Sequence, residues 1–245
     1  MDLERYVLFL ILIGICVAFS AAASRKVKTT YTAFGKVWNK SCLTGYDTAI
    51  MLLRSNNITD ISVNRVQGML TDHYDPTKKQ VNLSAEVHGS SSVAAVAVAA
   101  HEIGHVLQKK KGYLPYKIRS FLVPVANFGS RLAFPLVLVG MLLDAYLYGT
   151  SNADLGYYLA MAGVVLYGTS TLFMLATLPV EFDASRRAKR MLLEKGILTD
   201  EEIVGAEKVL SAAAMTYVAS LAVSLVYFLR FLVWVLALFG NRRRR

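Results

Sequence analysis

Four long apolar segments constrain what this chain can fold into more than any other feature. They cover residues 6–23, 121–148, 157–178 and 212–239. Each is close to or above the roughly 20 residues that a helix needs to cross a bilayer, where backbone hydrogen bonds must be made within helices or a closed barrel. A hydrophobic fraction of 55% and a mean hydropathy of +0.42 agree with this. We therefore predict a mainly α membrane protein with about four apolar membrane helices.

The first apolar segment has two interpretations. Residues 21–23 are three alanines and resemble a signal-peptide cleavage site. However, residues 1–5 lack the net positive charge of the region that precedes the apolar part of a signal peptide, whereas Arg25, Lys26 and Lys28 follow the segment. This charge pattern favours an uncleaved anchor whose C-terminal side lies in the cytoplasm.

A HExxH pattern supplies the candidate chemistry. His101 and His105 are four residues apart, with Glu102 beside them. On a helix, residues i and i+4 share one face, so both imidazoles can bind one metal ion. Zinc suits neutral imidazole ligands, and Glu102 would serve as the general base. The alternative is an amphipathic helix whose histidines are ordinary polar residues.

The sequence around this pattern predicts a small α+β region. Thr44 and Asp47 are spaced as an N-cap pair for a short helix. Residues 61–64 and 80–83 read as short strands, with a turn at 75–78 before the second. Serines 90–92 can cap the HExxH helix, which should end at 109–112 and be buried because it is apolar nearly all round.

The third metal ligand has two main candidates. Residues 149–156 are short enough to make the second and third apolar segments a helical hairpin, which returns Glu181 to the side of the membrane that holds His101. Glu181, at the expected start of a helix, is therefore favoured. Asp144 lies inside an apolar segment, where burying a carboxylate in the membrane costs free energy and so suggests a function. With Asp144 as a ligand, the metal site would lie within the membrane. The other residues weighed are Asp75, Asp183, His73 and His88.

The net charge of +10 is best explained by the membrane. Lysine and arginine cluster beside the apolar segments, where anionic headgroups attract them. We predict no nucleic-acid partner, since no nucleic-acid motif accompanies the charge. Cys16 and Cys42 lie in an apolar and a polar stretch and are not expected to form a disulfide.

Charge also predicts the orientation. The basic clusters flank the HExxH region and the segment after the hairpin, which places the candidate site in the cytoplasm. Four full crossings would put the C-terminus outside, whereas Arg242–Arg245 favours the inside. We therefore expect the last segment to break near Arg230, with 231–239 too short to span the bilayer alone.

The expected organisation has five parts. Residues 1–23 form the anchor, 24–117 the HExxH region, 118–178 the membrane hairpin, 179–211 a helical segment with the third ligand, and 212–245 the C-terminal membrane segment and basic tail.

Three motifs carry a resemblance to a known family. They are Asp-His-Tyr-Asp-Pro at 72–76, Ala-His-Glu-Ile-Gly-His at 100–105, and Leu-Pro-Val-Glu-Phe-Asp-Ala at 178–184. In order and spacing the chain resembles the YugP-type neutral zinc metallopeptidases of bacterial membranes over nearly its whole length, and more distantly the HtpX-type membrane proteases. The resemblance implies a zincin-like catalytic part, one Zn²⁺ held by His101, His105 and Glu181, and Glu102 as the base. The HtpX-type pattern has an Asp four residues after the ligand Glu. Here Ser185 stands in its place, and Asp183 is poorly spaced to substitute for it.

The expected function is a membrane-bound zinc endopeptidase that hydrolyses peptide bonds in a peptide or protein substrate. Two alternatives remain at this point. One is a non-catalytic, metal-stabilised membrane scaffold or adaptor, and the other is an intramembrane, site-2-protease type of enzyme with Asp144 as ligand. An intact Glu102 favours catalysis, because a structural zinc site needs no base and fills its fourth position with a protein ligand.

Overall fold

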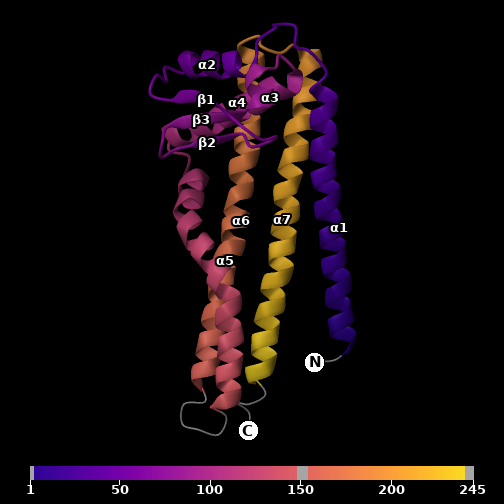
Figure 1. Cartoon of the computed structure of the whole chain (residues 1–245), viewed down its shortest axis with the longest axis vertical. Helices are drawn as coiled ribbons and strands as arrows, with labels where there is room; N and C mark the ends of the chain where they lie inside the picture. The colour runs from indigo at the N-terminus through magenta and orange to yellow at the C-terminus, as the bar shows by residue number, and fades with distance from the viewer. Residues whose placement is uncertain (1–2, 148–153, 241–245) are drawn as a thin grey trace. The chain divides into compact units, whose positions relative to one another are not determined.

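The computed structural model describes residues 3–147 and 154–240 and divides them into two compact units (Figure 1). The helical unit contains 3–20, 118–147, 154–177 and 217–240, and the mixed unit contains 21–117 and 178–216. Most of the connection expected at 149–156, and the basic tail 242–245, lie outside the described residues.

Long helices dominate the secondary structure. They are α1 (Leu3–Phe34), α5 (Leu114–Tyr146), α6 (Asp154–Glu194) and α7 (Asp200–Gly240). In the described part of the chain, four helical stretches are long and apolar enough to cross a membrane, namely Val7–Phe34, Leu114–Tyr146, Asp154–Glu194 and Asp200–Ala237. The prediction of a mainly α chain with about four apolar membrane helices is confirmed. Each helix extends beyond its apolar run into polar sequence.

Small residues allow close helix packing within the helical unit. A Cβ added to Gly140 of α5 would lie 2.5 Å from the backbone nitrogen of Ala160 and 2.6 Å from the carbonyl oxygen of Gly156, both on α6. Contacts of this kind suit membrane helices, whose association relies on close van der Waals packing. α5 also contains Pro124 and Pro135, and it is visibly bent in Figure 1.

Two sequence-based expectations about helix breaks are wrong. α6 does not end at residue 178 and restart at Glu181, because it runs through Pro179 without interruption. Val180 and Ala184 are fully buried, and this packing offsets the hydrogen bond that a proline removes. α7 likewise continues through Arg230, whose guanidinium carbon lies 4.6 Å from the centre of the Phe9 ring within the same unit. This cation–π contact compensates part of the cost of the charge.

A three-stranded sheet forms part of the mixed unit, with β1 (Ser62–Val66), β2 (His73–Asp75) and β3 (Gln80–Ser84) in the order β1-β3-β2. β1 pairs with β3 in parallel, and β2 pairs with β3 antiparallel (Figure 1). The predicted turn before β3 is confirmed, since a carboxylate oxygen of Asp75 accepts hydrogen bonds from the backbone nitrogens of Thr77 and Lys78. β2 was not predicted, because three residues are too short to show an alternating pattern.

Three shorter helices complete the mixed unit, namely α2 (Gly45–Ser55), α3 (Ala85–Gly89) and α4 (Val93–Lys110). The predicted caps are present: Thr44 and Asp47 form a capping box on α2, and the Ser92 side chain accepts from the Ala95 nitrogen at the start of α4. The core gathers around α4, with Leu52, Leu83 and Ile103 among its fully buried members. The HExxH pattern therefore lies on the most buried helix of this unit.

Candidate metal centre

α4 presents the HExxH residues on one face. The rings of His101 and His105 lie 4.7 Å apart between centroids and are nearly perpendicular, with an interplanar angle of 86°. Glu102 and His105 are buried, at 7% and 8% exposure, whereas His101 is partly open. The helical spacing therefore brings both imidazoles together, as the pattern predicted.

α6 adds a carboxylate to the two imidazoles. Glu181 Oε2 lies 3.2 Å from His101 Nε2 and 3.6 Å from His105 Nε2. The three candidate ligand atoms all lie within 4.8 Å of one another, and among the described residues this is the one group of three or more His, Cys, Asp or Glu side chains compact enough to hold a metal ion. All three residues belong to the mixed unit. Two imidazole nitrogens and one carboxylate oxygen match the three protein ligands of a catalytic zinc site.

Gly104 explains how the two helices approach closely enough. A Cβ at this position would lie 2.7 Å from the carbonyl oxygen and 3.1 Å from the Cα of Ala184 on α6. No real side chain tolerates the shorter of these distances without movement. The glycine inside the HExxH pattern thus lets α6 pack against α4 at the height of Glu181.

Polar side chains support both histidines, and sequence reasoning missed the more important of them. Gln108 is completely buried, and its Oε1 lies 3.0 Å from His105 Nδ1. The Ser185 hydroxyl lies 3.2 Å from Nδ1 of His101, so the position at which the HtpX-type pattern has an Asp still contacts a histidine. Asp183 reaches no histidine ring and instead accepts from Gln108. A buried glutamine three residues after His105 on an apolar helix was the available signal for this arrangement.

Burial sets the electrostatics of the α4 residues. It raises the pKa of the Glu102 carboxyl, and the nearby His105 and His101 only partly counter this. For His105, burial alone would lower the pKa, but hydrogen bonding to Glu181 and its negative charge outweigh burial and raise the pKa. The Glu102 carboxyl and the His105 imidazole therefore both bind a proton more tightly than exposed groups of the same type.

The other residues considered from the sequence lie elsewhere. Asp144 is on α5 in the helical unit and, among the described residues, is not a member of the histidine–glutamate cluster. Asp75 holds its turn, as described above. His73 uses both ring nitrogens, contacting the Thr71 carbonyl oxygen at 2.8 Å and the Asn82 side chain at 3.0 Å. His88, which the neighbouring Gly89 and serines predict to lie in a loop, belongs instead to the short helix α3.

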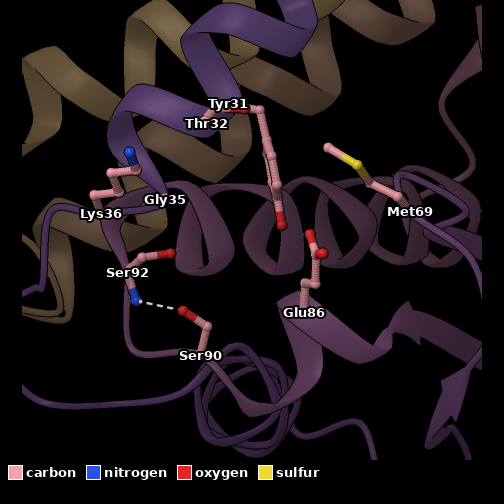
Figure 2. Close-up of a pocket in the computed structure, with 8 residues that line it drawn as sticks. All are labelled: Tyr31, Thr32, Gly35, Lys36, Met69, Glu86, Ser90 and Ser92. Atoms are coloured by element: carbon pink, nitrogen blue, oxygen red, sulfur yellow. Dashed lines mark hydrogen bonds between the residues drawn. The ribbon is translucent and has the colours of Figure 1, made fainter.

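A separate hollow of about 390 Å³ lies between the end of α1 and the start of α4 (Figure 2). In the view of Figure 2 the Tyr31 hydroxyl and the Glu86 carboxylate point toward one another across it. No histidine or cysteine is among its lining residues, which are Tyr31, Thr32, Gly35, Lys36, Met69, Glu86, Ser90 and Ser92. The hollow thus lacks the nitrogen and sulfur ligands that zinc prefers.

Comparison with known proteins places the chain in a family. Residues 8–236 match the family model described as "Putative neutral zinc metallopeptidase". The chain is 42% identical over 226 residues to a Bacillus subtilis (strain 168) protein named "Putative membrane protease YugP", and the match covers 92% of this chain and 96% of that protein. No solved structure matches the chain. On this evidence the chain belongs to the neutral zinc metallopeptidase family.

Proposed function

We propose that this protein is a membrane-bound zinc endopeptidase with His101, His105 and Glu181 as the zinc ligands and Glu102 as the general base. The observation that carries the proposal is the convergence of two Nε2 atoms and one buried carboxylate within 4.8 Å. Glu102 follows His101 directly on the same helix and is itself buried. Family membership supports the choice of zinc and of peptide hydrolysis.

The chemistry follows from these groups. A zinc ion held there would supply a Lewis acid that polarises the scissile carbonyl and lowers the pKa of water toward about 7. Glu102 accepts the proton of the attacking water, because it lies directly beside His101 on the same helix and is not one of the three proposed ligands. Glu102 then delivers this proton to the nitrogen of the leaving amine. The substrate is a peptide or protein.

The test of catalysis uses the purified full-length protein and the variant Glu102→Gln. We expect the wild type to contain about one zinc and to degrade casein until a chelator is added. The variant should keep its zinc and lose activity by a factor on the order of 10² to 10⁴, the range for general acid–base catalysis. Glu194→Gln is the matched control, since Glu194 is exposed at the end of α6.

Two outcomes would contradict the proposal. Undiminished casein cleavage by Glu102→Gln would exclude the assigned base. A wild type that binds zinc stoichiometrically yet cleaves no peptide would favour the metal-stabilised scaffold instead.

We also propose that the site faces the cytoplasm of a bacterial cell, because basic residues flank the mixed unit's segments. Single cysteines at Ser55 and Ser151, in a variant without Cys16 and Cys42, test this orientation. Ser55 is exposed on α2, and Ser151 lies outside the described residues. An impermeant thiol reagent on intact cells should label the Ser151→Cys variant but not Ser55→Cys; the opposite pattern would reverse the orientation.

A further inference from the structure

Gln108 stands out as a fully buried polar side chain that contacts His105 but is not one of the three candidate ligands. It lies three residues after His105 on α4, with none of its surface exposed. Its Nε2 lies 2.7 Å from the Val180 carbonyl oxygen and 2.9 Å from Asp183 Oδ2. Its Oε1 lies 3.0 Å from His105 Nδ1. The hydrogen-bonding capacity of this amide is therefore used on both sides.

These contacts determine which way the Gln108 amide points. The Val180 carbonyl and the Asp183 carboxylate are both acceptors, so each takes one of the two N–H donors of the amide nitrogen. The opposite orientation would place the amide oxygen against two acceptors. The oxygen must then be the atom that faces His105.

The orientation of the amide in turn determines the tautomer of His105. An amide oxygen accepts hydrogen bonds and does not donate them, so Nδ1 of His105 must carry the hydrogen. In the neutral ring, Nε2 then holds the free lone pair, and Nε2 is the atom nearest Glu181. His101 differs, because its Nδ1 faces the hydroxyl of Ser185, which can donate or accept.

The amide is itself held from α6. Arg187 donates through Nε to Asp183 Oδ2 at 2.6 Å, one helical turn along the same helix. Arg187 thus holds in place the Asp183 carboxylate that accepts a hydrogen bond from Gln108. Val180, the other acceptor, immediately precedes Glu181 in the chain.

We infer that Gln108 is a positioning residue that locks His105 in the Nδ1–H tautomer and so presents Nε2 to the metal ion. The inference rests on the proposed zinc site. The two histidines then differ in their hydrogen-bond partners. Gln108 fixes the tautomer of His105, whereas the Ser185 hydroxyl allows either tautomer of His101. Partners of this kind on ligand histidines contribute about 10- to 100-fold to metal affinity.

The experiment compares Gln108→Met with Gln108→Glu in the full-length protein. Methionine removes the acceptor for Nδ1–H. Glutamate keeps that acceptor, and as a buried acid beside the Asp183 carboxylate it carries a proton, so it has one O–H where glutamine has two N–H donors toward Val180 and Asp183. We expect zinc affinity, measured by chelator competition, to fall about 10- to 100-fold in Gln108→Met and to stay within about threefold of wild type in Gln108→Glu. Ser185→Ala, the matched control at His101, should lose less than Gln108→Met.

Thermal unfolding of the metal-free proteins separates this role from a structural one. Both Gln108 variants should unfold at lower temperature than wild type, since both lose at least one hydrogen bond to α6. A role limited to bridging the helices would lower the zinc affinity of both variants equally, and that result would overturn the inference. So would an unchanged affinity in Gln108→Met.

A measurement on the wild type needs no variant. In zinc-loaded protein labelled with ¹⁵N-histidine, the nitrogen shifts should show His105 bound through Nε2 with a hydrogen on Nδ1; binding through Nδ1 would overturn the inference. A wild type that binds no zinc would remove the proposed function, and the inference with it. Normal zinc binding with the wrong tautomer would remove the inference alone.

Discussion

The two units bury their side chains by different rules. In the mixed unit, aliphatic residues such as Leu52, Leu83 and Ile103 are fully enclosed, and buried Gln108 has partners for both ends of its amide. In the helical unit, large apolar side chains point outward, including Phe121 at 74% exposure and Leu142 at 62%. The first pattern is typical of a core stabilised by the hydrophobic effect in water. The second is typical of a surface that contacts lipid.

The difference between the units bears on where this chain can bury charged side chains. Desolvated charges need partners. In the mixed unit, His101 and His105 of α4 provide them for the Glu181 carboxylate of α6. In the helical unit, glycines such as Gly140 let neighbouring helices approach closely at their backbones. The candidate metal ligands therefore all lie in the mixed unit, whereas the helical unit presents the apolar surfaces that suit a membrane.

The largest expected effect tests this division directly. Glu181→Ala should reduce the zinc content of the purified protein to near zero, because it removes one of three ligands. Asp144→Ala, in the helical unit, should leave the content near one per chain. Metal analysis of both variants after gel filtration decides the matter, and the reverse result would make the site intramembrane.

A smaller effect sharpens the comparison of packing. Gly104→Ala should destabilise the protein by about 1–3 kcal/mol, the usual cost of overpacking, because its Cβ would meet the backbone of Ala184. Gly14→Ala on α1 is the control, since a Cβ there meets no atom within 4 Å. The control should be neutral or stabilising by up to about 1 kcal/mol, as expected for glycine in a helix. Equal unfolding midpoints for the two variants in detergent would contradict this account.

The smallest effect concerns the surface of the mixed unit. Asp60 accepts from Lys110 at 2.7 Å and Lys79 at 3.2 Å, and these contacts lower the pKa of its carboxyl from 3.8 to about 2. A lowered folded-state pKa stabilises the fold above the unfolded value and loses that contribution as the pH falls toward 2. Asp60→Asn should therefore lower the unfolding midpoint only slightly at pH 7. The difference should shrink at high salt and vanish at low pH; a salt-independent loss would show that the side chain acts otherwise.

Local signals predicted much of the fold. The apolar segments, the Thr44–Asp47 capping box and the turn at Asp75 depend on neighbours within a few residues, and all are confirmed. The spacing of His101 and His105 likewise fixed their shared helical face. Their role as ligands, with Glu181, and that of Glu102 as base stay predictions.

What the sequence did not reveal depends on packing between distant segments. The sequence predicts a helix that starts at Glu181, but burial of Val180 and Ala184 keeps α6 continuous through Pro179. The sequence shows Gln108 only as a polar residue on an apolar helix, and its partners Asp183 and Val180 lie 75 and 72 residues further along the chain. No local pattern encodes such a contact, since its partners are chosen by the tertiary fold.

The contact between Gly104 and Ala184 also fixes the rotational phase of α6 at the candidate site. Each residue in an α-helix advances the direction of the side chain by about 100°, so Glu181 and Ala184, three apart, project from nearly the same side. Inserting one residue between them would keep both residues in the sequence. It would nevertheless rotate the Glu181 carboxylate by about 100° about the helix axis, away from the histidines. The spacing of three residues between Glu181 and Ala184 therefore matters to the candidate site as much as the two residue types do. A related chain that keeps the glutamate but changes this spacing should not bind the metal ion.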